Sequence, residues 1–192
     1  MVGKSAAGTI WRSCGAMHER GGPYWLTRWG RTTGGLDIWT IEILGGDPIR
    51  LEHLVLDING TLTNRGELID GVAERLQRLA GDLALHIVTA DTLGTANALG
   101  VGDRLGVSVT IIRTGADKAA FVRRIGAWGT VAIGNGRNDG AMLRASRLGI
   151  AILGPEGASG LTLGVADVVC RSITDALDLL LDRRALSSTI RA

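Results

Sequence analysis

Short apolar runs alternate with amphipathic segments from about residue 38 onward. The runs have the length of buried strands, and the segments between them repeat apolar residues at helical spacing, as at Val72, Leu76 and Leu79. The pattern predicts strands at 38–43, 54–57, 84–89, 107–112, 130–134, 149–153 and 167–170, and helices at 72–79, 92–99, 116–125, 138–146 and 173–182. Such alternation is typical of α/β proteins, so we predict a doubly wound, Rossmann-like parallel sheet in a three-layer sandwich.

Residues 60–68 break this alternation. They hold turn residues at Asn64-Arg-Gly66 and lie between the predicted strand 54–57 and the predicted helix 72–79. We predict a small hairpin-like flap there.

Residues 1–40 differ from the rest of the chain. They contain four of the five tryptophans and show neither helical nor strand periodicity. We predict a disordered or irregular extension, followed by one folded domain at 41–192. The alternative is that the tryptophan-rich segment docks a partner.

Composition narrows the class of protein. The two cysteines give no disulfide framework, and no apolar run approaches the ~20 residues that cross a membrane, so we expect a cytoplasmic protein with no membrane partner. Residues 1–40 carry five basic and two acidic residues, which leaves 16 basic and 17 acidic residues from the totals of 21 and 19. The net charge of residues 41–192 is therefore close to zero, and a nucleic-acid partner is not expected.

The strand predicted at 54–57 ends in a carboxylate, Asp57, and Gly60 allows a sharp turn just after it. Open α/β sheets bind ligands beyond the carboxyl ends of their strands, so we expect Asp57 in that crevice. A carboxylate beside the N–H groups of a loop is equipped to attack phosphorus and form an aspartyl-phosphate.

Three later segments supply the other groups that phosphoryl transfer needs. Strand 84–89 ends in the Thr89 hydroxyl, Lys118 lies in the first turn of helix 116–125, and Asp139 follows strand 130–134. Catalysis of this reaction is mostly positioning and charge neutralisation, which a hydroxyl, a cation and a metal-binding carboxylate provide. Among 21 basic residues only Lys4 and Lys118 are lysine, which favours a specific role for Lys118.

In order and spacing, these four motifs resemble those of the haloacid dehalogenase superfamily of phosphotransferases, over about residues 41–183. The run Gly134-Asn-Gly-Arg-Asn-Asp139 is similar to the Gly-Asp-Gly-x-Asn-Asp signature of P-type ATPases, which suggests a soluble relative of their phosphorylation domain. The resemblance implies a Mg²⁺-dependent phosphohydrolase or phosphotransferase that acts on a small phosphorylated substrate. Only 61 residues separate Asp57 from Lys118, too few for a pump's nucleotide-binding domain, so we expect a capless site closed by the flap or by a second copy of the chain.

The resemblance also implies residue roles. The catalytic set is Asp57, Asn59, Thr89 and Lys118. Phosphate would contact Asn59, Gly60, Thr89, Ala90 and Lys118, and Mg²⁺ would contact Asp57, the Asn59 carbonyl, Asn135 and Asp139. Thr61, Gly134 and Asn138 would support the site, whereas His53 and His86 are expected to be structural and Asp91 to cap a helix.

Two residues depart from the family pattern. Asn59 stands where most phosphatases of the superfamily have an aspartate that serves as general acid, and an amide cannot transfer a proton near neutral pH. Asn135 stands where the family often has a carboxylate, which should weaken Mg²⁺ binding. We expect slow turnover or good leaving groups, and the alternative is a weakly active or non-catalytic phosphate-binding regulatory protein.

Overall fold

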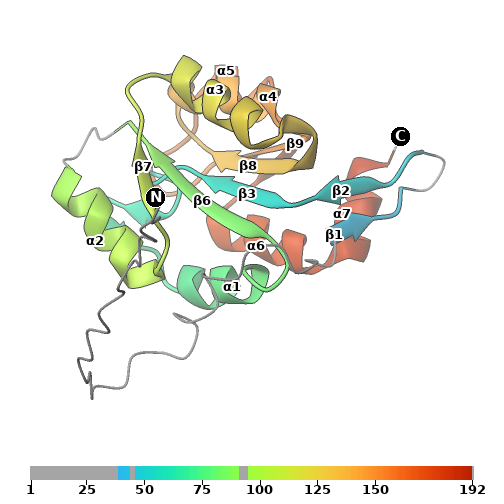
Figure 1. Ribbon diagram of the computed structural model, residues 1–192, viewed down its shortest axis with the longest axis horizontal. Coiled ribbons are helices and arrows are strands. Elements are labelled where there is room, and N and C mark those ends of the chain that lie inside the picture. Colours follow the sequence, from blue (N-terminus) through green and yellow to red (C-terminus); the bar gives the residue numbers. More distant parts are fainter. Residues whose placement is uncertain (1–38, 44–45, 91–94, 192) are drawn as a thin grey trace, which may run out of the picture. The chain divides into compact units, whose positions relative to one another are not determined.

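The computed structural model describes residues 39–43, 46–90 and 95–191, and its main feature is a six-stranded parallel sheet (Figure 1). The strands of this sheet are β3 (His53–Leu56), β6 (Ala84–Thr89), β7 (Val109–Ile111), β8 (Thr130–Gly134), β9 (Leu148–Ile152) and β10 (Val168–Cys170). Their order is β10-β9-β8-β3-β6-β7. The chain leaves β3 toward β6 and β7 and then crosses to β8, β9 and β10 on the other side, so the predicted doubly wound sheet is confirmed.

Helices cover both faces of the sheet, as a three-layer sandwich requires. The helices are α1 (Val72–Leu79), α2 (Thr95–Leu105), α3 (Gly115–Ile125), α4 (Gly140–Ala145), α5 (Gly160–Leu163), α6 (Ile173–Leu181) and α7 (Arg183–Ile190). Figure 1 shows α3, α4 and α5 along one side of the sheet and α1 and α6 along the other. Alternate strand residues divide between the two cores, with Leu54 and Leu56 facing α1 and α6 while Val55 faces α3 and α4.

The α3 and α4 side of the sheet carries small side chains. Val55, Ala132 and Ala151 face these helices, and a Cβ at Gly149 would lie 2.8 Å from the Leu143 carbonyl oxygen of α4. This close approach matters because Lys118 lies in the first turn of α3 and Asp139 lies directly before α4.

The predicted flap is a short hairpin of β4 (Thr63–Asn64) and β5 (Glu67–Leu68). Its two loop residues, Arg65 and Gly66, have φ of 51° and 87°, as two-residue hairpin turns with positive φ at both positions require. In the described segment between β3 and α1 this hairpin is the sole insertion, in agreement with a capless arrangement.

Three elements were not predicted. Strand β2 (Ile49–Leu51) pairs antiparallel with β1 (Trp39–Ile41), and both α5 and α7 extend the helical layers. Trp39 is buried in strand β1, so the predicted boundary between residues 40 and 41 falls inside a strand. Residues 1–38 lie outside the described part of the chain, and the predicted division into an extension and a domain stays a prediction.

Helix α2 differs from its predicted range of 92–99, because it spans Thr95–Leu105. Gly100 and Gly102 argue against a helix at the sequence level, but a Cβ at Gly102 would lie 2.6 Å from Val109 and 2.8 Å from the Val107 carbonyl oxygen. Close packing on the approach to β7 therefore accounts for Gly102. Residues 92–94 and Asp91, with its predicted capping role, lie outside the described residues.

Candidate active site

Asp57 follows β3 in the centre of the sheet, and the other predicted residues come from neighbouring strand ends. Thr89 ends β6, Asn135 follows β8, and Asp139 ends the short 3-10 turn Arg137–Asp139 before α4. The sequence-predicted residues therefore meet at the carboxyl edge of the sheet, where two crossovers diverge on either side of β3.

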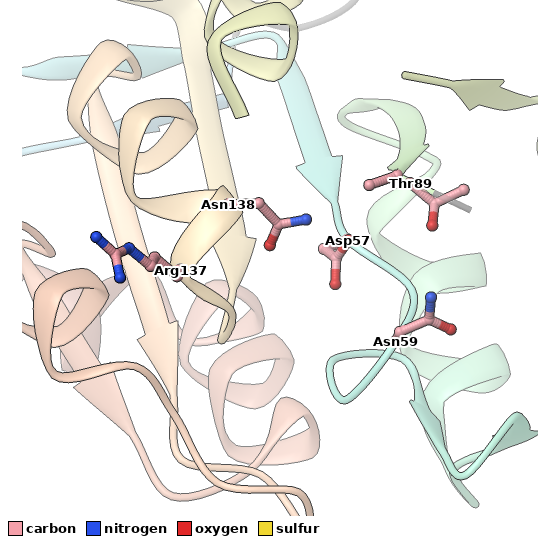
Figure 2. Close-up of a pocket in the computed structure, with 6 residues that line it drawn as sticks. Asp57, Asn59, Thr89, Arg137 and Asn138 are labelled. Carbon is pink, nitrogen blue, oxygen red and sulfur yellow. The ribbon is translucent and has the colours of Figure 1, made fainter. Parts of the chain in front are cut away.

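A cavity of about 310 Å³ opens at this edge. Its lining consists of Asp57, Asn59, Thr89, Ala90, Arg137 and Asn138. Figure 2 places Asp57 between Asn138 on one side and Thr89 and Asn59 on the other, with the Asn138 amide directed toward Asp57. Five of the six lining residues were predicted from sequence.

Lys118 does not line the cavity itself, and its ammonium group contacts two carboxylates. Its Nζ is 2.5 Å from Asp57 Oδ1 and 2.7 Å from Asp139 Oδ1, and its side chain has no exposed surface. The start of α3 is fixed by Thr114, whose hydroxyl accepts the Asp117 N–H, so Lys118 leaves the first turn toward the sheet. The sequence predicted a phosphate contact, and the structure adds an ion-pair network with Asp57 and Asp139.

Asp139 is completely buried and uses both carboxylate oxygens. Oδ1 accepts from Lys118, and Oδ2 accepts the backbone N–H groups of Asn135 at 3.1 Å and Gly136 at 2.9 Å. Gly134 makes this possible, since a Cβ there would lie 2.6 Å from Asp139 Cβ and Cγ. Asp139 thereby joins the loop after β8 to the lysine of α3.

The electrostatics of this cluster explain an altered pKa at the proposed nucleophile. Burial, followed by the negative charge of Asp139, raises the pKa of Asp57 to about 7, against the opposing effect of Lys118. Burial acts to lower the pKa of Lys118, but the two carboxylates outweigh it and raise that pKa, which keeps the lysine protonated. Two carboxylates therefore share one ammonium group in a site that is almost completely buried.

This donor set fits a divalent cation. A cation next to Asp57 would offset both the burial of its charge and the repulsion from Asp139. The described residues contain no group of three or more His, Cys, Asp or Glu side chains that could hold a metal by themselves. Mg²⁺ suits such a site, because it takes few carboxylates and completes its shell with carbonyl oxygens, water and substrate phosphate.

Two residues have contacts that the sequence did not predict. The Thr61 hydroxyl lies 3.3 Å from Asp57 Oδ2 and 3.1 Å from Asn135 Oδ1. Arg137 lines the cavity but was not among the predicted residues, and its side chain in Figure 2 leads away from Asp57. Its place inside the Gly134–Asp139 run was the signal that could have identified it.

The two histidines that were predicted to be structural, His53 and His86, lie away from this edge. His53 is at the start of β3 and His86 is in β6, with His86 Nε2 3.2 Å from His53 Nδ1.

None of the helices in the described part of the chain combines the length and the apolar character that spanning a bilayer requires.

Comparison with known proteins finds similarity both in sequence and in structure. No family model matches the chain. An uncharacterized protein of Methanocaldococcus jannaschii, MJ0073, is 48% identical over 61 residues, which are 32% of this chain and 66% of that protein. The alignment therefore spans slightly less than two thirds of this relative.

Three solved structures illustrate the likeness in fold. The 3-deoxy-D-manno-octulosonate 8-phosphate phosphatase of Moraxella catarrhalis, in complex with magnesium, phosphate and KDO, has a TM-score of 0.58 and 19% identity over 73% of this chain and 94% of its own. A hydrolase of Legionella pneumophila assigned to subfamily III A of the HAD superfamily has a TM-score of 0.53 and 19% identity over 73% of this chain and 87% of its own.

The third is the catalytic domain of the CPx-ATPase CopB-B, with a TM-score of 0.52 and 20% identity over 60% of this chain and 46% of its own. The predicted resemblance to phosphatases and to a P-type ATPase catalytic domain thus extends to the fold. The chain has the haloacid dehalogenase fold, a parallel sheet with Asp57 at the end of its central strand.

Proposed function

We propose that this protein is a Mg²⁺-dependent phosphohydrolase of the haloacid dehalogenase type, which acts through an aspartyl-phosphate on Asp57. The observation that carries the proposal is the buried cluster of Asp57, Lys118 and Asp139 beside a cavity lined by Thr89 and Asn59. The phosphatases among the structural neighbours, one of them with magnesium and phosphate, support the same reaction class.

In the first step, a carboxylate oxygen of Asp57 attacks the phosphorus atom, and the bond from phosphorus to the leaving oxygen breaks. Lys118 holds the nucleophile through Oδ1, so Oδ2 is the oxygen available for attack. Thr89 and Asn59 line the cavity, which supports a role for the Thr89 hydroxyl and the loop N–H groups at Asn59 and Gly60 as donors to the phosphoryl oxygens. Asp57, the Asn59 carbonyl and Asp139 would hold Mg²⁺, which would supply positive charge between the two anions. The predicted contact of Mg²⁺ with Asn135 is not part of this proposal, because its amide already bonds Thr61 and Gly157.

In the second step, water attacks the same phosphorus atom, which releases inorganic phosphate and restores the carboxylate. Asn59 cannot protonate the leaving oxygen in the first step or accept a proton from water in the second. A general acid–base group typically contributes about 10²–10⁴-fold to the rate. We therefore propose substrates whose leaving group departs as a stable anion, such as acyl phosphates or nucleoside di- and triphosphates, and a slow second step.

Hydrolysis of acetyl phosphate and of an alkyl phosphate with Mg²⁺ tests the proposal. The parent protein should prefer acetyl phosphate, and Asp57→Asn should abolish hydrolysis, while Asp103→Asn, at an exposed position on α2, should retain it. Asn59→Asp should accelerate the alkyl phosphate more than acetyl phosphate. Hydrolysis that survives Asp57→Asn contradicts the proposed nucleophile.

The second candidate function is phosphate sensing with little turnover, which the amides of Asn59 and Asn135 favour. In that case the protein would bind a phosphoryl mimic such as beryllium fluoride with Mg²⁺, and the parent would hydrolyse neither substrate. Measurable turnover that depends on Asp57 excludes this alternative.

A further inference from the structure

The side chain of Asn135 uses both atoms of its amide group. Nδ2 donates to the Gly157 carbonyl oxygen at 2.8 Å, and Oδ1 accepts the Thr61 hydroxyl at 3.1 Å. A backbone carbonyl can only accept, so the nitrogen must face Gly157 and the oxygen must face Thr61. The residue is 7% exposed, and both amide atoms have partners, so the side chain has little freedom to rotate.

Thr61 connects this amide to the proposed nucleophile. It is fully buried, and its one proton faces two acceptors, Asp57 Oδ2 at 3.3 Å and Asn135 Oδ1 at 3.1 Å. When Asp57 Oδ2 takes part in a reaction, Asn135 remains as an acceptor for the hydroxyl, so that this buried group is not left unsatisfied.

Asn135 also ties together two loops beside the cavity. The Ser159 N–H donates to the Asn135 carbonyl oxygen at 2.9 Å, so both ends of the 157–159 segment are held by one residue. The flap starts against the same side chain, because a Cβ at Gly60 would lie 2.5 Å from Asn135 Nδ2. At the flap tip, the Arg65 N–H donates to Glu156 at 2.7 Å.

We propose that Asn135 is a positioning residue that needs to be an amide, because it links Asp57, through Thr61, to the loop 153–159 and the flap. This proposal rests on the proposed function for its kinetic effects, although the contacts themselves do not. An aspartate at 135 would keep the acceptor for Thr61 but would turn a carboxylate oxygen toward the Gly157 carbonyl, where no hydrogen bond can form. The departure from the family carboxylate is then a requirement of this chain's own loops.

The test compares Asn135→Asp and Asn135→Ala with the parent at saturating Mg²⁺. Both variants should lower kcat for acetyl phosphate by at least tenfold, with a smaller change in KM. Amide hydrogen exchange of residues 154–159, measured without substrate, should become faster in both variants. Thr61→Val should also lower kcat, whereas Thr61→Ser, which keeps the hydroxyl, should recover most of it.

Two results would overturn the proposal: a kcat of Asn135→Asp within twofold of the parent, or unchanged exchange at 154–159. The exchange measurement separates this proposal from the proposed function, because it needs no turnover. If the parent hydrolyses nothing but exchange still accelerates, the proposed function fails and the structural link holds. If Asn135→Asp does not fold, the contrast between Thr61→Val and Thr61→Ser decides, and equal kcat values for the two reject the link.

Discussion

Replacement of Lys118 by methionine tests the charge balance of the buried cluster most severely. In the parent, one ammonium group contacts Asp57 at 2.5 Å and Asp139 at 2.7 Å, and the lysine side chain is fully buried. Methionine fills a similar volume but leaves two carboxylates in a dry environment without their counter-charge.

The expected loss of stability follows from these contacts. At such separations each ion pair contributes about 6 kcal/mol of Coulomb energy with an effective dielectric constant of about 20, before the cost of desolvation. Because desolvation offsets much of this, removal of one partner from a buried pair typically costs about 3–5 kcal/mol. That is a large part of the total of about 5–15 kcal/mol that stabilises an ordinary domain.

Urea unfolding of Lys118→Met, with and without Mg²⁺, measures the effect. The free energy of unfolding should fall by about 3–5 kcal/mol without metal, and Mg²⁺ should stabilise the variant more than the parent. Asp57→Asn should destabilise less, or even stabilise, in the Lys118→Met background, because it removes one of the two unpaired charges. Arg75→Gln is the control, since the Arg75–Asp178 pair is partly exposed and its loss should cost much less.

If Lys118→Met has the same free energy of unfolding as the parent, Lys118 does not balance two buried charges. That result would mean that the carboxylates are solvated or already protonated in the folded protein. Equal destabilisation by Arg75→Gln would also contradict the proposed charge balance, because buried and exposed pairs would then behave alike.

Three further predictions concern packing, pH and the flap. Gly134→Ala should destabilise the protein by about 1–3 kcal/mol in a urea titration and reduce activity, since its Cβ would lie 2.6 Å from Asp139. Gly100→Ala, with no atom within 4 Å of the added Cβ, should be neutral or stabilising in the same measurement. Burial, followed by the proximity of His53, lowers the pKa of His86 to about 4. Between about pH 6.5 and 4 the unfolded state therefore binds a proton at His86 that the folded state does not. The melting temperature should fall on acidification through this window, and His86→Gln should make it depend less on pH. Arg65→Asn should raise the melting temperature, because asparagine adopts the positive φ of 51° at that position at a lower cost than arginine. An unchanged or lower melting temperature would show that arginine carries no strain in this turn.

The sheet was predictable because its strands carry an unambiguous local signal. Strand 84–89 and helix 72–79 were predicted with the bounds that the structure has, since each is an apolar or amphipathic run between clear turn residues. Strand β2 was missed because only Glu52 separates it from β3. Helix α7 was missed because it follows α6 with Asp182 as its cap and buries only Leu186.

The membership of the site was predictable, but its contacts were not. The carboxyl ends of parallel strands meet at one edge of the sheet, so Asp57, Thr89 and Asp139, which follow or end three of these strands, could be placed together from topology alone. The orientation of Asn135 depends on Thr61, 74 residues before it, and on Gly157, 22 residues after it. No local pattern encodes such a pair of partners.

The central claim is that Asp57 becomes phosphorylated. The most direct measurement is mass spectrometry of peptides from protein that has been incubated with acetyl phosphate and Mg²⁺ and quenched in acid. We expect a phosphoryl adduct on Asp57 that hydroxylamine removes and that Asp57→Asn abolishes. An adduct on any other residue, or hydrolysis of acetyl phosphate without an adduct at Asp57 at any quench time, would contradict this claim.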